Sequence, residues 1–467
     1  MIGGKIIMSR QRRRMRDMLC CAGLVLLIYC LFLAGQVPGQ SQRTTSSATN
    51  LDSVAGHHPP ELLNNLSLTA SQCAAAFPNL TWSIEDVVSQ GAFTLTPKTA
   101  PVLGHIKPGQ LHILKSQRKN ELSSDMLNSR TASLHQIHRA ILTAPPSEPV
   151  PDTVFALNFH DQPFGTAWAY SRQADPKFRP GLDDANANAR TFLMPHFSFW
   201  AWTLPFVGSM GRAAEAIAQI ETKLYPTFAS KIPKAVWRGT TWFNSVHNPR
   251  LRANLLAAAR DKPWADVEAL AWDGPAGGDG KAGERTASNS IPVEDFCKYK
   301  YILHTEGVTY SGRFQFLQLC ASVVITPPIG WMQHATHLVK PVFSSALLAV
   351  AGLEEGEPWP AASPMTRRSW GQGYGPQEAN IVFVRPDWSD LDEVIRWLEG
   401  HPDVAEGIAT RQRGLFAGGG YFSPAAEACY WRALIKGWSE VARVDEGELA
   451  EFGPGQTFES FVLTNGD

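Results

Sequence analysis

The chain has 467 residues, a formal net charge of -1 and 18% charged residues, an ordinary composition for a globular protein. Its length is sufficient for two or three domains of the usual size. A nearly neutral chain produces no large electrostatic field, so the composition argues against nucleic acid as a partner. Basic residues cluster at one place only, close to the N-terminus: Arg10, Arg12, Arg13, Arg14 and Arg16.

An apolar run without charged residues, 18–35, follows this arginine cluster. Its roughly eighteen residues are short but sufficient for one membrane-spanning helix. Positive charge before such a run favours a cytosolic N-terminus. The sequence therefore predicts a cytosolic basic tail (1–17), a transmembrane signal anchor (18–35) and a lumenal remainder. A cleaved signal peptide is the alternative, although its apolar core is normally shorter.

Residues 36–70 are predicted to form a flexible stem. Most of this segment is rich in Ser, Thr, Gln, Pro and Gly and nearly free of aromatic residues, so it cannot bury enough apolar surface to fold. Acceptor sequences for N-glycosylation begin at Asn65 and at Asn79, and both fit a lumenal side.

Seven cysteines are present, and three of them lie in or beside the apolar run. An even number remains in the lumenal part, where an oxidising compartment favours disulfides over free thiols. Sequence alone leaves three connectivities open among these cysteines, and their spacing does not match a zinc site. They are Cys73, Cys297, Cys320 and Cys429.

The first clearly predicted strand is Val154–Phe159, which runs directly into His160 and Asp161. In open α/β folds, ligands bind beyond the carboxyl ends of strands, so Asp161 is a candidate base and His160 a second one. A turn or a helix cap is the alternative role for such an aspartate. Before this strand, the segment 73–88 is predicted to dock on the fold rather than to belong to its core. The chain from 100 to 142 is mixed and polar, with helical periodicity only near its end.

The segment 191–206 is dense in aromatic residues and prolines, and it predicts either plain core or a wall against a sugar ring. A helix is expected at 212–224. A second strand, 234–239, ends in Arg238-Gly239-Thr240-Thr241, where glycine lets a ligand approach the backbone. The helix that follows, 249–260, carries Arg250 and Arg252 in its first turn, and both are interpreted as surface residues.

A strand (299–303), a polar loop, a helix (314–320) and a second strand (322–326) predict a βαβ unit. Its loop, Gly307 to Arg313, places Ser311, Gly312 and Arg313 where the helix begins. A helix N-terminus favours an anion, and the planar guanidinium of arginine suits a diphosphate. A capped helix with a salt-bridged arginine is the alternative. Later elements are a strand at 381–384, helices at 389–398, 403–413 and 424–444, and surface loops at 274–290 and 354–377.

Several motifs in a fixed order resemble glycosyltransferase family 90, the group of capsule-associated-protein-like enzymes and protein O-glucosyltransferases. The resemblance covers roughly residues 70 to 440, and it includes a similarity to a fungal-type β-xylosyltransferase. The motifs are P-D-T-V-F-A-L-N-F-H-D-Q-P (151–163), M-P-H-F-S-F-W (194–200), A-V-W-R-G (235–239), C-K-Y-K-Y-I-L (297–303), G-V-T-Y-S-G-R-F-Q-F-L-Q-L-C-A-S-V-V (307–324) and C-Y-W (429–431).

This resemblance implies an α/β fold of the GT-B type, with two Rossmann-like domains facing a cleft. An acceptor domain (71–230) would precede a UDP-sugar domain (231–415), and a terminal helix and tail (416–467) would pack back on the first. The implied reaction is transfer, with inversion, of glucose or xylose from a UDP-sugar to a hydroxyl of a glycan, glycolipid or protein. The alternatives are a catalytically silent, membrane-anchored glycan-binding protein with the same fold, and a phosphotransferase that uses the same cleft.

The resemblance also implies a role for individual residues. Asp161 would be the general base, and Arg238 and Arg313 would bind the diphosphate. The disulfides would be Cys297–Cys320 and Cys73–Cys429. The remaining donor-binding residues would be Gly239, Thr240, Gly307, Val308, Thr309, Ser311 and Gly312.

No Asp-x-Asp motif follows a strand, so no metal ligand is predicted, and a divalent-metal requirement stays open. No tightly bound cofactor is expected. The sequence does not end in an ER-retrieval tetrapeptide, which, with the anchor, favours a single-pass type II protein of the Golgi membrane. The endoplasmic reticulum membrane is the alternative location.

Overall fold

The computed structural model describes residues 58–175, 190–204, 206–272, 287–350, 364–371 and 373–464. The predicted basic tail and signal anchor lie outside these ranges, as do most of the predicted stem, residues 274–286 of the loop at 274–290, and residues 354–363 and 372 of the loop at 354–377. The described part of the second loop contains the helix α10 (Pro364–Ser369) and the buried Trp370, so the prediction of a surface loop was wrong there. Within the described ranges, no helix is both long enough and apolar enough to span a membrane.

A sheet of six parallel strands forms the half of the fold that contains the predicted βαβ unit. Its strands read as short apolar runs because both faces of the sheet are buried. The strands predicted at 234–239, 299–303, 322–326 and 381–384 are all present. In spatial order the sheet comprises β13 (Pro341–Phe343), β14 (Ile381–Phe383), β11 (Val323–Thr326), β10 (Tyr299–Leu303), β8 (Ile232–Gly239) and β9 (Ala265–Ala269).

The predicted helices of this half follow their expected positions closely, with one exception, whereas α9 (Ser344–Val350) and α10 (Pro364–Ser369) were not predicted as helices. The helix expected at 314–320 is a single turn, α8 (Phe314–Leu317). Its apolar residues are all buried, so their spacing does not indicate one buried face of a longer helix. Beyond this turn, Cys320 is joined to Cys297 by a disulfide. The other helices are α6 (Met210–Gln219), which continues as a π-helical turn (Ile220–Leu224), α7 (Leu251–Ala259), α9 (Ser344–Val350), α10 (Pro364–Ser369), α11 (Leu391–Gly400) and α12 (Pro402–Arg413).

The second six-stranded sheet is mixed rather than parallel. The parallel pairings of this sheet join β4 to β5 and β5 to β7, whereas β2 and β3 form an antiparallel hairpin beside β4. The sequence did not predict this hairpin, although Pro108-Gly109 at its turn, with Gly109 at φ +71°, is a typical turn pair. The strands are β16 (Gln456–Thr457), β3 (Gln110–Ser116), β2 (Val102–Lys107), β4 (Thr153–Asn158), β5 (Ala167–Ala169) and β7 (Thr191–Leu193).

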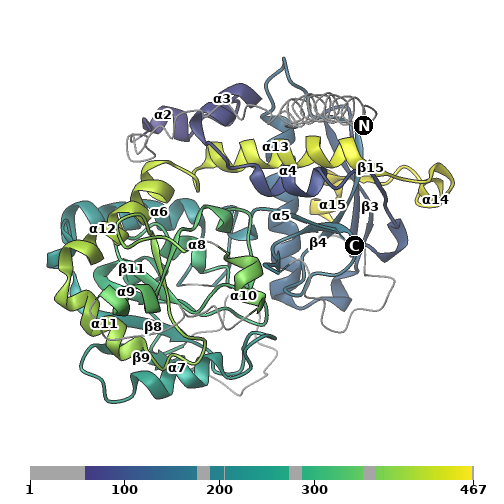
Figure 1. Ribbon diagram of the computed structural model, residues 1–467. Helices are drawn as coiled ribbons and strands as arrows, with labels where there is room; N and C mark the ends of the chain where they lie inside the picture. The colour runs from purple at the N-terminus through teal and green to yellow at the C-terminus, as the bar shows by residue number, and fades with distance from the viewer. Residues whose placement is uncertain are drawn as a thin grey trace, which may run out of the picture. The chain divides into compact units, whose positions relative to one another are not determined.

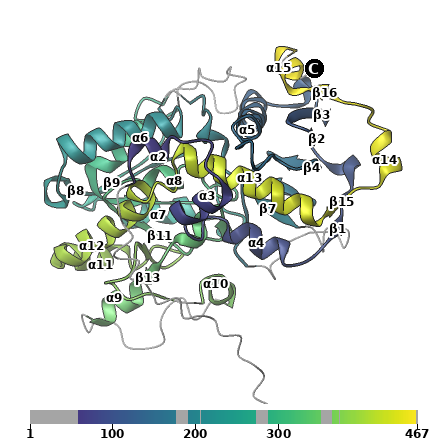
Figure 2. The same cartoon turned by 90° about the horizontal axis from the view of Figure 1, so that it is seen from above.

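The long helix α13 (Pro424–Val441) lies along α3 (Ala70–Ala76) and α4 (Trp82–Val88) in both views (Figure 1 and Figure 2). Phe77, Leu80 and Ile84 are buried in this contact. The segment 73–88 is therefore part of the core, and the expectation that it only docks on the fold was wrong. The helix α5 (Ser124–Leu142) packs on the other side of α13 and is twice as long as its weak periodicity predicted.

One continuous cluster of buried hydrophobic side chains extends from the mixed sheet to the inner face of the parallel sheet. A second cluster fills the other face of the parallel sheet, against α7, α11 and α12. The remaining elements are short: α2 (Pro60–Leu63), β1 (Phe93–Thr94), β6 (Arg172–Gln173), β12 (Trp331–Met332), β15 (Ala442–Arg443), α14 (Glu446–Ala450) and α15 (Phe458–Leu463).

Candidate active site

A cavity of about 840 Å³ lies where the carboxyl end of β4 meets those of β8 and β10. Asp161, Arg238 and Arg313 all line it, so the structure brings together the predicted base and the two predicted diphosphate-binding arginines. Thr309 does not line the cavity, but its hydroxyl donates a hydrogen bond to the Asp161 carbonyl oxygen at 2.6 Å. The other lining residues among those predicted are Gly239, Thr240, Gly307, Val308, Ser311 and Gly312.

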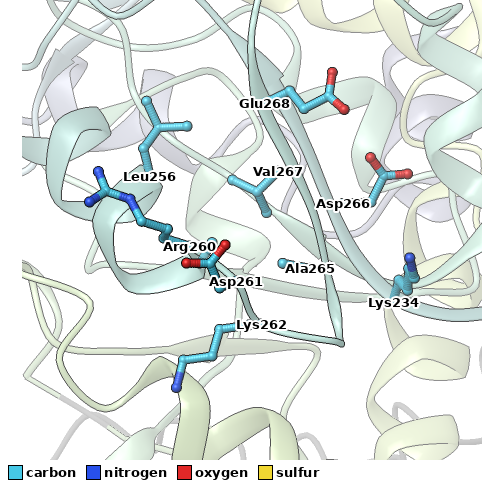
Figure 3. A pocket seen from close by; sticks show the side chains of 10 residues that line it. Lys234, Leu256, Arg260, Asp261, Lys262, Ala265, Asp266, Val267 and Glu268 are labelled. Atoms are coloured by element: carbon cyan, nitrogen blue, oxygen red, sulfur yellow. The ribbon is translucent and has the colours of Figure 1, made fainter.

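A second hollow, of about 660 Å³, lies between α7 and β9 (Figure 3). Its walls carry side chains of both charges, among them Arg260, Asp261, Asp266 and Glu268. It contains none of the predicted site residues. The first cavity is therefore the candidate active site.

Asp161 is placed by a turn that the preceding asparagine organises. The Asn158 side chain accepts a hydrogen bond from the His160 amide at 3.0 Å and donates one to the Phe164 carbonyl at 2.9 Å. This turn directs the strand's exit into the cavity, where the Asp161 side chain is exposed. The surrounding cavity walls displace part of the water around this carboxylate, and this desolvation raises the pKa of Asp161 although the side chain stays accessible from the cavity. A carboxylate with a raised pKa accepts a proton from a hydroxyl more readily than an ordinary one.

His160, the second candidate base, lines the same cavity, and its Nε2 lies 3.1 Å from Gln117 Oε1. Partial burial lowers the pKa of His160, which favours the neutral imidazole.

Arg238 is buried at the end of β8, and most of its donors are already engaged. Its Nη2 pairs with Asp266 Oδ1 at 2.6 Å, and its Nη1 donates to the carbonyl oxygens of Trp237 and Asp266. Its Nε donates to the Asn289 carbonyl oxygen at 3.2 Å. The adjacent carboxylate therefore offsets the positive charge of Arg238.

Arg313 differs from Arg238 in having no carboxylate partner among the described residues. Its Nη1 donates to the Arg238 carbonyl oxygen, and its guanidinium lies over the Phe296 ring, 5.2 Å from the centroid. Its Nε is buried without a hydrogen-bond partner in the described part of the chain. Burial lowers the pKa of Arg313 to about 10, so it remains a cation at neutral pH. In the described part of the chain Arg313 therefore forms no salt bridge, contrary to the alternative of a capped helix with a salt-bridged arginine.

Arg252 was interpreted as a surface residue, and that interpretation was wrong. Its side chain is only 6% exposed and lines the cavity. It donates to the Thr240 carbonyl oxygen at 2.7 Å, to the Thr240 hydroxyl at 2.9 Å and to the Glu306 carbonyl oxygen at 2.9 Å. Arg250, two residues earlier, is exposed as expected. No local sequence feature distinguishes the two arginines, because the difference depends on which side of α7 faces the strand ends.

Two motifs from different halves of the chain hold each other at the cavity. The buried His196 lies against Gly312, where a Cβ atom would be 2.5 Å from His196 Nε2. Gln315 donates to the Ser198 hydroxyl at 2.7 Å, and that hydroxyl lies 2.8 Å from His196 Nδ1. Burial lowers the pKa of His196 to about 3, so the imidazole is neutral. Gly312 is thus required for close approach, in addition to its predicted place at the start of a helix.

The aromatic segment 191–206 divides between the core and the cavity. Phe192 and Phe199 are buried in the core, whereas Phe197, Trp202 and Phe206 line the cavity. The core interpretation is confirmed for the first two residues, and a wall against a sugar ring stays a prediction for the other three.

An aromatic rim at the cavity was not predicted. Phe164 and Phe243 line the cavity and are 41% and 47% exposed, and the neighbouring Trp242 is 57% exposed. The amide of Val246, in the same loop as Phe243, donates to the Val308 carbonyl oxygen at 3.1 Å. The loop from Gly307 to Arg313 is thus bonded on one side to the segment that carries Phe243 and on the other, through Thr309, to Asp161. We call Phe164, Trp242 and Phe243 the aromatic rim.

The two disulfides that the resemblance implied are both present, Cys73–Cys429 and Cys297–Cys320. Asn65 and Asn79 are exposed, and glycosylation of either stays a prediction. Among the described residues, one group lies close enough to hold a metal ion: Glu221 with Cys297 and Cys320. Its cysteines are disulfide-bonded and supply no thiolate.

Comparison with known proteins gives the same assignment as the motifs. The family model described as "Glycosyl transferase family 90" matches residues 98–344, more than half of the chain. Protein O-glucosyltransferase 1 of Homo sapiens is 24% identical over 156 residues, 33% of this chain and 30% of that protein. O-glucosyltransferase rumi of Drosophila melanogaster is 23% identical over 317 residues, 65% of each chain. The rumi homolog of Anopheles gambiae is 24% identical over 225 residues, 48% of this chain and 46% of that protein.

The chain spans between 30% and 65% of the length of these relatives. Their names favour the glycosyltransferase interpretation over the catalytically silent one. The matched range contains Asp161, Arg238, Arg252 and Arg313, which all line the cavity. By the extent of this match, the chain belongs to glycosyl transferase family 90.

Proposed function

We propose that the chain is an inverting glycosyltransferase that uses a UDP-sugar, with the two-domain GT-B arrangement. The donor would bind the parallel-sheet half (231–415), and the acceptor would approach from the mixed-sheet half (71–230), with the final segment (416–467) packed back on it. One observation carries this proposal: a carboxylate at the end of β4 shares a cavity with buried arginines that lack carboxylate partners among the described residues.

The chemistry follows from these groups. The acceptor hydroxyl oxygen forms a bond to the anomeric carbon while the bond from that carbon to the diphosphate oxygen breaks. Asp161 takes the hydroxyl proton, and the electron pair of the broken bond leaves with UDP. Because attack and departure occur on opposite faces, the configuration inverts. Arg313 stabilises the negative charge that grows on the leaving diphosphate.

We propose glucose as the transferred sugar and a protein hydroxyl as the acceptor, because the relatives are named for these two. The exposed aromatic rim supports an acceptor with an apolar face, since such groups gather at binding sites. Membrane anchoring through 18–35 and a Golgi or endoplasmic reticulum location are proposed from the sequence, and two disulfides agree with an oxidising compartment.

The proposal is tested by incubating the purified full chain with UDP-glucose, UDP-xylose and UDP-galactose and measuring the nucleotide released. UDP release that is fastest with UDP-glucose and increases with a protein acceptor is the expected result. UMP release would indicate transfer of a sugar phosphate instead. Failure of UDP to bind in calorimetry would favour the catalytically silent alternative. Repeating the assay with EDTA, and then with Mg²⁺ or Mn²⁺ restored, determines the metal requirement.

A further inference from the structure

We propose that Arg252, rather than Arg238, provides the second positive charge of the diphosphate site, together with Arg313. The Arg238 guanidinium would then stay in its ion pair with Asp266, while the backbone carbonyl oxygen at this position helps to orient Arg313. This inference rests on the proposed function and reassigns one of the two diphosphate-binding roles.

The first argument is charge compensation. A cation removed from water is destabilising unless an opposite charge pairs with it. Arg238 has this pairing, with Asp266 at 2.6 Å and Glu268 at 3.8 Å. Arg252 has no carboxylate partner in the described part of the chain, and its hydrogen bonds go to two carbonyl oxygens and one hydroxyl. An uncompensated charge therefore remains beside the cavity at Arg252 and not at Arg238.

The second argument is that Arg252 and Arg313 act on the same space. Burial and then the charge of Arg313 lower the pKa of Arg252 to about 9, and burial, followed by the charges of Arg313 and Arg252, lowers the pKa of His304. Arg252 and Arg313 both line the cavity, so two like charges lie in one buried region. Their mutual repulsion is unfavourable in a region of low dielectric, and a bound anion removes it.

The third argument is what Arg252 holds in place. Its guanidinium joins Thr240, at the end of β8, to Glu306, which directly precedes the loop from Gly307 to Arg313. Both loop segments line the cavity. Arg252 therefore places positive charge at the junction of the two segments predicted to bind the donor, where a nucleoside diphosphate carries its negative charge.

The experiment measures binding of UDP, UMP and uridine to the full chain by calorimetry. Arg252→Gln is expected to lower the affinity for UDP about 10- to 100-fold, which is the range for loss of a hydrogen bond to a charged group. The affinity for UMP should fall less, and the affinity for uridine, which has no phosphate, should stay within about twofold of the wild-type value. Arg252→Lys keeps the charge and should recover part of the loss. Arg250→Gln, the matched control on the exposed neighbour, should bind like the wild type.

The comparison for Arg238 uses the double variant Arg238→Gln/Asp266→Asn, which removes the ion pair without changing the net charge. The double variant should lower the affinity for UDP less than Arg252→Gln does. Two outcomes would overturn the inference: a larger loss of UDP affinity in this double variant than in Arg252→Gln, or equal losses of affinity for UDP and for uridine in Arg252→Gln. Neither outcome would affect UDP binding by the wild type. Absence of UDP binding by the wild type would instead refute the proposed function itself.

Discussion

At the scale of single residues, the charged side chains of the site differ in whether an oppositely charged side chain pairs with them. Three arginines line one cavity, and among the described residues only Arg238 of these three forms an ion pair with a carboxylate. Asp161 has the complementary property, since it is a carboxylate that no described cation pairs with, and burial raises its pKa. Groups that the fold leaves uncompensated are typical of functional sites, because a substrate completes their interactions.

Asp161→Asn is expected to reduce sugar transfer by about 100- to 10,000-fold, the usual contribution of a general base, while UDP still binds. Wild-type activity should rise with pH through the raised pKa of Asp161, and the variant's residual activity should not. Asp152→Asn, at the exposed opposite end of β4, is the control and should retain activity. Transfer at the wild-type rate by Asp161→Asn would refute the assignment of the base.

The same variant has a predictable effect on stability. Because the native state raises the pKa of Asp161, it binds the proton more tightly than the unfolded chain does, so stability falls as pH rises through that interval. The asparagine removes this penalty. Its melting temperature at neutral pH should therefore equal or exceed that of the wild type, and the difference should shrink below about pH 4. A clearly lower melting temperature at neutral pH would show that the carboxylate stabilises the fold.

At the scale of elements, the site is assembled by loops at strand ends that touch one another. The loop after β10 reaches the loop after β4 through Thr309, and it reaches the loop before α6 through Gly312 and His196. These contacts hold the loop from Gly307 to Arg313, the proposed donor-binding loop, from both halves of the fold. Its conformation therefore depends on close packing as much as on its own sequence.

Gly312→Ala tests this dependence. The added methyl group would lie 2.5 Å from His196 Nε2, so the loop must shift. Overpacking of this kind costs about 1–3 kcal/mol, and the shift should also weaken UDP binding. Gly375→Ala, where a Cβ meets nothing within 4 Å, is the matched control and should change neither quantity. Unfolding curves and UDP calorimetry measure both, and wild-type behaviour of Gly312→Ala would contradict the packing argument.

At the scale of the whole molecule, the first and last parts of the described chain are fastened together. The disulfide Cys73–Cys429 joins α3 to α13 across a sequence separation of 356 residues. Arg432, one turn later on α13, donates to the Leu66 and Leu68 carbonyl oxygens at 2.7 and 2.8 Å. The other disulfide, Cys297–Cys320, has a separation of only 23 residues and acts within the parallel-sheet half.

Removal of each disulfide should destabilise the chain to a different extent. In the loop-entropy model a cross-link stabilises by about 2–5 kcal/mol, with more for a longer loop. Cys73→Ala/Cys429→Ala should therefore lower the unfolding free energy more than Cys297→Ala/Cys320→Ala does. Denaturant unfolding without reductant measures this. The reverse order would show that local packing at Cys297 and Cys320, and not chain entropy, dominates.

The sequence by itself determined β4, four strands of the parallel sheet, most of the longer helices, and the positions of Asp161 and the loop from Gly307 to Arg313. Apolar periodicity and the placing of ligands at strand ends are local properties, whereas the other strands of the mixed sheet are short or are defined by their pairing. The order of motifs determined the family. Only the tertiary structure decided that Arg252 is buried while Arg250 is exposed, and that Arg238 pairs with Asp266 on the neighbouring strand. Those facts depend on contacts between segments far apart in the chain, and no periodicity or propensity encodes such contacts.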